Sequence, residues 1–351
     1  MLIYYILFLF VVVCMISGNE KTYPNKNLKV LFLFVYCITA FRSFSIGTDT
    51  KGYIEEYISG DYFLRSVDQG FSYLNLCLKE LGLSPRLYLM LVSLIIILPV
   101  FTFISRYLKE GKSFAVLLYL TIGNFTFNLA GMRQSIAVAI LLTGLVLYDK
   151  IERVLPKYIV IASSIYLAFS FHYTAGVCVL ILPLLWFSRR TFPIDNKLAK
   201  IFLMVLPIVI MVSTKYVENV VNYFIITKYE HYETSFGDSN VVSYIIIPYC
   251  MYLYTLFLFY RSNSSDWKKN FCFYCSIVHM CVAACTLYMP MLGRFEYYFS
   301  MPLMCLIVNL TMELPLSTRQ LFVFAISIVC MAFFLISTPG GTLKIDNYSF
   351  F

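Results

Sequence analysis

Five charged or titratable side chains lie at the ends of long apolar segments, where a charge is costly to keep: Arg42, Asp49, Arg133, His172 and Arg294. A guanidinium binds phosphate through two parallel hydrogen bonds, so the three arginines are candidates for holding a pyrophosphate. A histidine can accept a proton from an attacking hydroxyl at neutral pH, which makes His172 the best candidate for a general base. Asp49 could orient a sugar hydroxyl or pair with one of the arginines.

Each of these residues also has a purely structural interpretation. Arg133 could snorkel toward a membrane interface, and Arg294 could pair with Glu296, two residues further along the chain. His172 could hydrogen-bond a helix end, and Asp49 could form a turn. The functional interpretation rests on their conjunction, because charged residues near membrane spans commonly mark a functional site.

The remaining chemical groups predict neither a metal nor a cofactor. The 11 cysteines lie mostly inside apolar runs and are interpreted as small buried apolar side chains rather than as a disulfide framework. No P-loop, GxSxG or HExxH motif occurs. His279 lies within an apolar run and is interpreted as an interhelical hydrogen bonder. No run carries Asp, Glu or Lys at its centre, whereas ion-coupled transporters usually need such a group.

The elements that carry the candidate residues are predicted to be membrane spans. The chain is 60% hydrophobic and 13% charged, with a mean hydropathy of +0.78, which excludes an ordinary soluble domain. No linker divides it, so we expect one integral membrane domain over residues 1–351. The net charge of +8 is distributed by loop, and nucleic acid is therefore not an expected partner.

The apolar runs predict an all-α polytopic membrane protein with about twelve transmembrane helices, several of them shorter than the roughly 20 residues of a typical span. The first run lacks a basic leader and a small-residue cleavage site, so we interpret it as a retained span. The predicted spans are residues 2–17, 28–41, 87–105, 113–128, 133–148, 157–171, 174–187, 199–214, 241–260, 270–289, 297–312 and 320–336.

Basic residues set the predicted orientation. Every second loop, beginning with 18–27, belongs to a set that with its flanks holds 17 of the 27 basic residues, and the first five of these loops carry at least three each. The positive-inside rule makes these loops cytoplasmic, which places both termini and all five candidate residues outside. The outer loops 42–86 and 215–240 are large. Each contains an amphipathic stretch expected to form an interfacial helix, carrying Phe71, Leu74, Leu78 and Leu81 in the first and Val217, Val220, Val221, Phe224 and Ile225 in the second.

Several short motifs occur in one order between about positions 42 and 300. They are GTDTKGY, DQGFSYLNLCLKELG, GMRQSIA, FHYTA and GRFEYY. In these motifs the chain resembles the EpsG-like branch of Wzy-type O-antigen and capsule polymerases.

The resemblance implies a GT-C-like membrane glycosyltransferase at the periplasmic face of a bacterial inner membrane. Its substrates would be a growing glycan on undecaprenyl pyrophosphate, as donor, and a new lipid-linked repeat unit, as acceptor. Its other partners would be membrane lipids and a chain-length regulator, with no cofactor. By the same resemblance, Arg133 and Arg294 would hold the donor pyrophosphate with Arg42 as a weaker candidate. Asp49 would organise the acceptor, and His172 would be the best base candidate, with Asp49 the alternative.

Three other functions stay open. A flippase or transporter of the lipid-linked oligosaccharide would need polar groups through both leaflets, whereas the predicted spans are polar mainly at one face. A membrane O-acyltransferase should present its histidine to the cytoplasm. An O-antigen ligase performs nearly the same chemistry on a different acceptor, but it usually carries its large outer loop between late spans, whereas residues 42–86 come early.

Overall fold

The computed structural model describes residues 2–17, 25–60, 68–190, 197–229, 241–262, 266–286, 288–289, 292–338, 344–345 and 347–350. These residues form helices and turns, and the described part of the chain contains no β-strand beyond one isolated bridge between Arg42 and Phe350. The all-helical prediction is therefore confirmed. The chain groups into two compact units, Met1–Leu182 with Thr311–Phe351 and Pro183–Leu310, which are described separately below.

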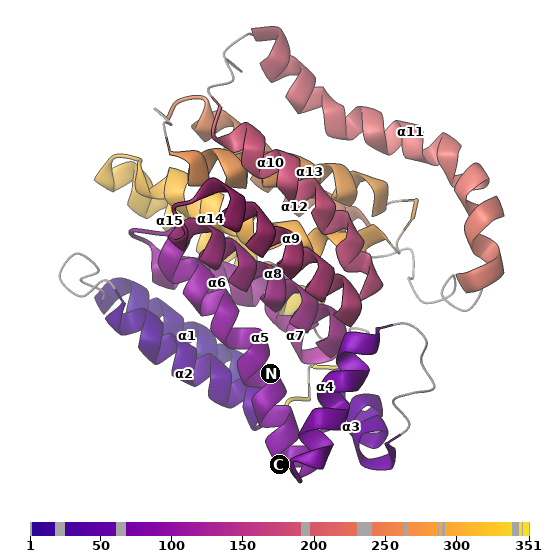
Figure 1. Ribbon diagram of the computed structural model, residues 1–351. Coiled ribbons are helices and arrows are strands. Elements are labelled where there is room, and N and C mark those ends of the chain that lie inside the picture. The colour runs from indigo at the N-terminus through magenta and orange to yellow at the C-terminus, as the bar shows by residue number, and fades with distance from the viewer. Residues whose placement is uncertain are drawn as a thin grey trace. The chain divides into compact units, whose positions relative to one another are not determined.

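The first unit contains most of the helices shown in Figure 1. They are α1 (Leu2–Ser17), α2 (Lys26–Ala40), α3 (Thr50–Ser59), α4 (Gln69–Glu80), α5 (Pro85–Tyr107), α6 (Lys112–Thr121), α7 (Asn124–Ala130), α8 (Met132–Lys150), α9 (Val154–Phe171), the 3₁₀ helix η2 (Tyr173–Leu180) and α15 (Leu316–Ser337).

The centre of this unit is formed by α6 and α8. Every residue of α6 is buried, and α8 packs between α5 and α9. Gly144 lets α8 and α9 approach closely, because a Cβ there would lie 2.4 Å from Ser164 Oγ. By contrast, α9 and α15 bury only 17% of their most apolar window and expose large apolar side chains, as expected for lipid-facing helices.

Sequence signals explain where several helices start and stop. Ser84 caps α5 by accepting a hydrogen bond from the Leu87 amide, and Pro85 occupies the first helical position. Gly60 ends α3 in the left-handed conformation that favours glycine (φ +89°). The amphipathic stretch expected in the loop 42–86 is α4, which buries Phe71 and Leu78 but leaves Leu81 exposed.

One predicted span is broken. Residues 113–128 were expected to form a single helix, but α6 and α7 are separate and bent by 55°. The break lies at Gly123, whose φ of +95° is open to glycine and strained for other residues. The predicted span 174–187 likewise begins as the 3₁₀ helix η2 and continues as α10 (Ile181–Ser188).

The second unit contains α11 (Lys197–Tyr229), α12 (Val241–Phe259), α13 (Trp267–Thr286) and α14 (Gly293–Met312). Helix α13 packs against α11 and α12. At 33 residues, α11 is about 50 Å long, well beyond the predicted span 199–214. Residues 215–229, assigned to an outer loop, continue this helix, and residues 230–240 lie outside the described part of the chain.

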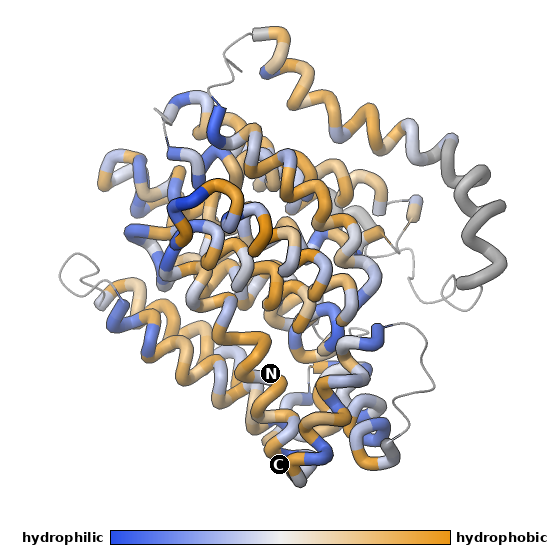
Figure 2. The backbone as a smooth tube through the Cα atoms, in the orientation of Figure 1, coloured by the Kyte–Doolittle hydropathy of each residue, from blue (hydrophilic) through white to orange (hydrophobic). Residues whose placement is uncertain are grey.

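All twelve predicted spans fall on helical segments. By length and composition, α5, α8, α9 and α15 can cross a membrane, and the bent pair α6–α7 makes a fifth candidate. Four further apolar helical segments are shorter. Figure 2 shows apolar residues predominating along the helices. The described residues therefore form an all-helical protein with four to five candidate membrane spans.

Candidate functional site

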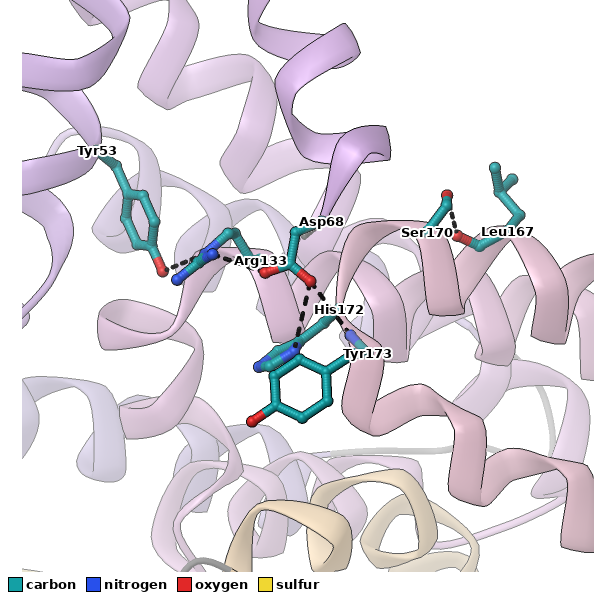
Figure 3. Close-up of polar contacts among 7 residues, drawn as sticks. All are labelled: Tyr53, Asp68, Arg133, Leu167, Ser170, His172 and Tyr173. Atoms are coloured by element: carbon teal, nitrogen blue, oxygen red, sulfur yellow. Dashed lines mark hydrogen bonds and ion pairs between the residues drawn. The ribbon is translucent and has the colours of Figure 1, made fainter. Parts of the chain in front are cut away.

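Three segments of the first unit meet around the carboxylate of Asp68 (Figure 3). Arg133, in the first turn of α8, donates from Nη1 to Asp68 Oδ2 at 2.6 Å. The other oxygen, Oδ1, accepts a hydrogen bond from the Tyr173 amide at 3.2 Å. Oδ1 also lies 4.0 Å from His172 Nδ1. A cation, a histidine and a backbone donor therefore converge on one carboxylate.

Asp68 is positioned by the start of α4. It adopts the left-handed conformation (φ +69°, ψ +41°), which Asp tolerates better than most residues, and its carbonyl accepts the first hydrogen bonds of the helix. Gly70 lets this turn approach the end of α9, because a Cβ there would lie 2.5 Å from Ser170 Oγ and 2.9 Å from Phe171 Cδ2. The same contact brings Asp68 to His172.

Arg133 is held on its other side by α3. Its Nε donates to the Tyr53 hydroxyl at 3.3 Å, and its guanidinium carbon lies 5.7 Å from the Tyr53 ring centroid. Glu56, one helical turn after Tyr53, is close enough to interact electrostatically with Arg133. The Arg133 side chain remains 25% exposed, whereas that of Asp68 is 5% exposed. The guanidinium therefore reaches solvent from a nearly buried ion pair.

His172 occupies the junction between α9 and η2. Its amide donates to the Ala168 carbonyl and so ends α9, while its extended backbone (φ −156°, ψ +121°) turns the chain into η2. The residue is buried at 7% exposure. The 4.0 Å separation from Asp68 is too long for a hydrogen bond, so the pair interacts as charges when His172 is protonated.

The cluster combines two chemical capacities. A carboxylate with a neighbouring histidine can accept a proton, and the exposed edge of Arg133 can bind an oxyanion. Among the residues that the structure describes, no three His, Cys, Asp or Glu side chains gather closely enough to hold a metal ion. The groups that the cluster offers to a substrate are therefore its own guanidinium, carboxylate and imidazole.

Comparison with known proteins identifies the family. The sequence model of the EpsG family matches residues 25–350, which is nearly the whole chain. The chain belongs to the EpsG family. The predicted resemblance to EpsG-like, Wzy-type polymerases is therefore confirmed. No curated protein and no solved structure matches the chain significantly.

Asp49 lies in the GTDTKGY motif of this EpsG-family chain, directly before α3. Its side chain is exposed and makes no capping hydrogen bond to α3. Its neighbours explain much of the motif: Thr50 Oγ1 donates to the Leu129 carbonyl at 3.0 Å, and a Cβ on Gly47 would lie 2.1 Å from the same oxygen. The motif therefore docks the start of α3 onto the end of α7, which places Tyr53 beside Arg133.

Arg42 is almost completely buried, at 1% exposure. Its Nη1 donates to the Thr39 carbonyl and to Ser93 Oγ, and its own carbonyl accepts from Arg86 at 2.7 Å. Burial lowers the pKa of the Arg42 guanidinium to about 10. Arg42 thus joins α2 to α5, and its hydrogen bonds are with this interior rather than with the Asp68 carboxylate.

The segment around Lys344–Phe350 covers the connection between α2 and α3. The Ser43 amide donates to the Ser349 carbonyl at 2.9 Å, and the Gly47 amide donates to the Lys344 carbonyl at 3.3 Å. The Tyr4 hydroxyl donates to the Ile345 carbonyl at 2.8 Å. These bonds tie residues 43–47 in place and support the docking of α3.

Arg294 belongs to the second unit, where it lies in the first turn of α14 and is half-buried. Glu296, its expected partner, lies beside the histidine of α13: His279 Nε2 and Glu296 Oε2 are 4.0 Å apart. His279 is 7% exposed. The second unit therefore contains its own pair of a histidine, which is buried, and an acid, which is partly exposed.

Asp68 and Tyr53 were not among the residues selected from the sequence. Asp68 begins the stretch DQGFSYLNLCLKELG and Tyr53 ends the motif GTDTKGY, and both stretches contributed to the family resemblance. The available signal was an acid directly before Gln-Gly and an amphipathic helix. That signal suggests a helix start, but it does not identify Arg133, 65 residues away, as the partner.

Proposed function

We propose that this chain is a membrane glycosyltransferase that polymerises undecaprenyl-pyrophosphate-linked oligosaccharide repeat units into a surface polysaccharide. The observation that carries the proposal is the Asp68–Arg133–His172 cluster, which combines a proton acceptor with an oxyanion-binding arginine. Membership of the EpsG family supports the reaction type. The bias of basic loops supports a cluster on the periplasmic face of a bacterial inner membrane.

The reaction needs little from the protein beyond charge control and one proton transfer. A hydroxyl oxygen of the acceptor repeat unit bonds to the anomeric carbon of the donor glycan, and the bond from that carbon to the pyrophosphate oxygen breaks. The electron pair leaves with the lipid diphosphate, and the hydroxyl proton passes to a base. Arg133 stabilises the developing charge on the diphosphate. Asp68 and His172 together receive the proton.

Asp49, exposed at the start of α3, would contact the acceptor. Arg294 belongs to the second unit, and its predicted role in binding the donor diphosphate stays a prediction. Arg42 would act by joining α2 to α5. The proposal includes about twelve spans in a GT-C-like arrangement, both termini outside, and a chain-length regulator as partner. It requires no cofactor.

A deletion and complementation experiment tests the proposal. Removing the gene from its native strain should reduce the surface polysaccharide ladder to a core that bears a single repeat unit, and the wild-type gene should restore the ladder. Arg133→Ala should insert normally but restore no ladder, because the diphosphate loses its stabilising cation. The matched control is Arg153→Ala, which removes an exposed arginine from a predicted cytoplasmic loop. This variant should restore the polysaccharide ladder.

Other outcomes would assign a different function. Loss of even the single repeat in the deletion strain would indicate a flippase or a ligase. An unchanged ladder would indicate an acyl modification of the glycan. A full ladder with Arg133→Ala would contradict the role of the cluster.

A further inference from the structure

A fully buried asparagine on α4 carries an inference beyond the reacting groups. Asn75 is 0% exposed, and neither its Nδ2 nor its Oδ1 has a hydrogen-bond partner in the part of the chain that the structure describes. A buried amide without partners destabilises a fold, and such groups are rare in native proteins. An aliphatic side chain of similar size would pack there at lower cost. Fold stability therefore does not explain why position 75 is an asparagine.

The contacts of its neighbours show what Asn75 faces. Residues four apart lie on one side of a helix, so Phe71, Asn75 and Lys79 form a single row along α4. Phe71 meets Tyr53 of α3, with ring centroids 5.4 Å apart, and Lys79 Nζ donates to the Ile58 carbonyl of α3 at 2.8 Å. Asn75 lies midway along this row, on the side of α4 whose two ends contact Tyr53 and Ile58 of α3.

That part of α3 leads directly to the reactive cluster. Glu56 lies between the two contact points, and both of its carboxylate oxygens are buried. Glu56 interacts electrostatically with Arg133, and Tyr53 contacts Arg133 directly. Asn75 and Glu56 thus extend the polar surface of the Asp68–Arg133–His172 cluster along the seam between α3 and α4.

We propose that Asn75 and Glu56 form a subsite that recognises hydroxyl groups of the sugar next to the reacting bond. This inference rests on the proposed function. An amide offers two donors and one acceptor and a carboxylate offers acceptors, which together match the mixed donors and acceptors of vicinal sugar hydroxyls. The rings of Tyr53 and Phe71 supply an apolar wall for the sugar face. The sugar enters as α3 shifts away from α4, and its hydroxyls satisfy the Asn75 amide.

Asn75→Leu tests the subsite because a packing role and a recognition role predict opposite results. The substitution keeps the branched shape of the side chain and removes two buried polar atoms, so the purified variant should melt at or above the wild-type temperature. In nanodiscs, with the lipid-linked repeat unit extracted from the deletion strain as substrate, its KM should rise at least about tenfold with kcat little changed. The matched control is Leu78→Met, a volume-conserving change on the same buried face of α4, which should keep the wild-type KM.

Each result of this experiment supports or overturns the proposed subsite. An active wild type together with a wild-type KM in Asn75→Leu would overturn the subsite alone. A wild type that cannot extend the repeat unit would overturn the proposed function and the subsite with it. If Asn75→Leu does not insert, Asn75→Ala replaces it: a raised KM at retained kcat supports the subsite, and an unchanged KM overturns it.

Discussion

The two units of the protein each bury a histidine beside a carboxylate, and the two pairs differ in the groups that contact the carboxylate. The nearest oxygen and nitrogen are 4.0 Å apart in both, between His172 and Asp68 and between His279 and Glu296. Only in the first pair does the structure place a guanidinium on the same carboxylate, at 2.6 Å, together with a backbone donor.

Their positions along the helices differ as well. His172 and Asp68 both lie at helix ends, whereas His279 lies within α13 and Glu296 in the first turn of α14. A histidine and an acid in proximity are therefore common to both units, whereas the structure shows a cation fixed on the carboxylate in the first pair. Oxyanion chemistry needs such a cation.

Neutralising the carboxylate of each pair gives the largest expected contrast. Asp68→Asn removes a proton acceptor and the charge that anchors Arg133, so we expect polymerisation to fall by a factor on the order of 10²–10⁴. Glu296→Gln should retain at least about a third of the wild-type rate, since that acid holds no cation of the cluster. Rates are measured on purified protein with lipid-linked repeat units as substrate.

Membrane insertion of both variants provides the control for this comparison, because a misfolded Asp68→Asn would lose activity for an unrelated reason. Equal losses in the two variants would mean that the units contribute equally to the reaction. A larger loss in Glu296→Gln would move the reaction site to the second unit.

Hydrophobicity located the helices but not the breaks within them. All twelve predicted spans fall on helical segments because a long apolar run has few other solutions in a membrane. Gly123 lies inside such a run, so nothing in the hydropathy marked the 55° bend there. The helix expected within residues 215–240 is present over 215–229, but it continues α11 instead of forming a separate helix, because helix formation continues wherever no strong breaker stops it.

The reactive cluster was predictable only in part. Arg133 and His172 stood out because a charged or titratable residue beside an apolar run is rare, and the structure brings both to one carboxylate. Asp68 did not stand out, since an acid in a polar loop is ordinary. Its importance comes from a left-handed turn and from contacts with residues 65 and 105 positions away. Such contacts depend on tertiary packing, which local sequence does not specify.

A smaller contrast is expected from adding one methyl group to a glycine in each unit. Gly70→Ala would place a Cβ 2.5 Å from Ser170 Oγ, so α4 must move away from α9. We expect a loss of about 1–3 kcal/mol in unfolding free energy. Activity should fall about tenfold or more, because Asp68 shifts relative to His172. At Gly293 the nearest side-chain atom would be 3.4 Å away, an ordinary contact, so Gly293→Ala should be nearly neutral.

Thermal unfolding and polymerisation rates, measured on both glycine variants, check this prediction. A Gly70→Ala protein that is less stable but fully active would show that the spacing of α4 and α9 does not control the cluster.

The smallest contrast isolates a single hydrogen bond to Arg133. Tyr53→Phe keeps the ring against Arg133 but removes the hydroxyl that accepts from Arg133 Nε at 3.3 Å. We expect the KM for the lipid-linked donor to rise about fivefold, because the guanidinium loses one of the two side-chain hydrogen bonds that orient it. Tyr249→Phe in the second unit removes a bond of similar length, 3.2 Å, to the uncharged Met204 carbonyl, and should leave the KM unchanged. Equal KM changes in the two variants would mean that Tyr53 stabilises α3 rather than orienting Arg133. An orienting role predicts a raised KM in Tyr53→Phe alone, because the Tyr249 hydroxyl bonds to the Met204 carbonyl instead of to Arg133.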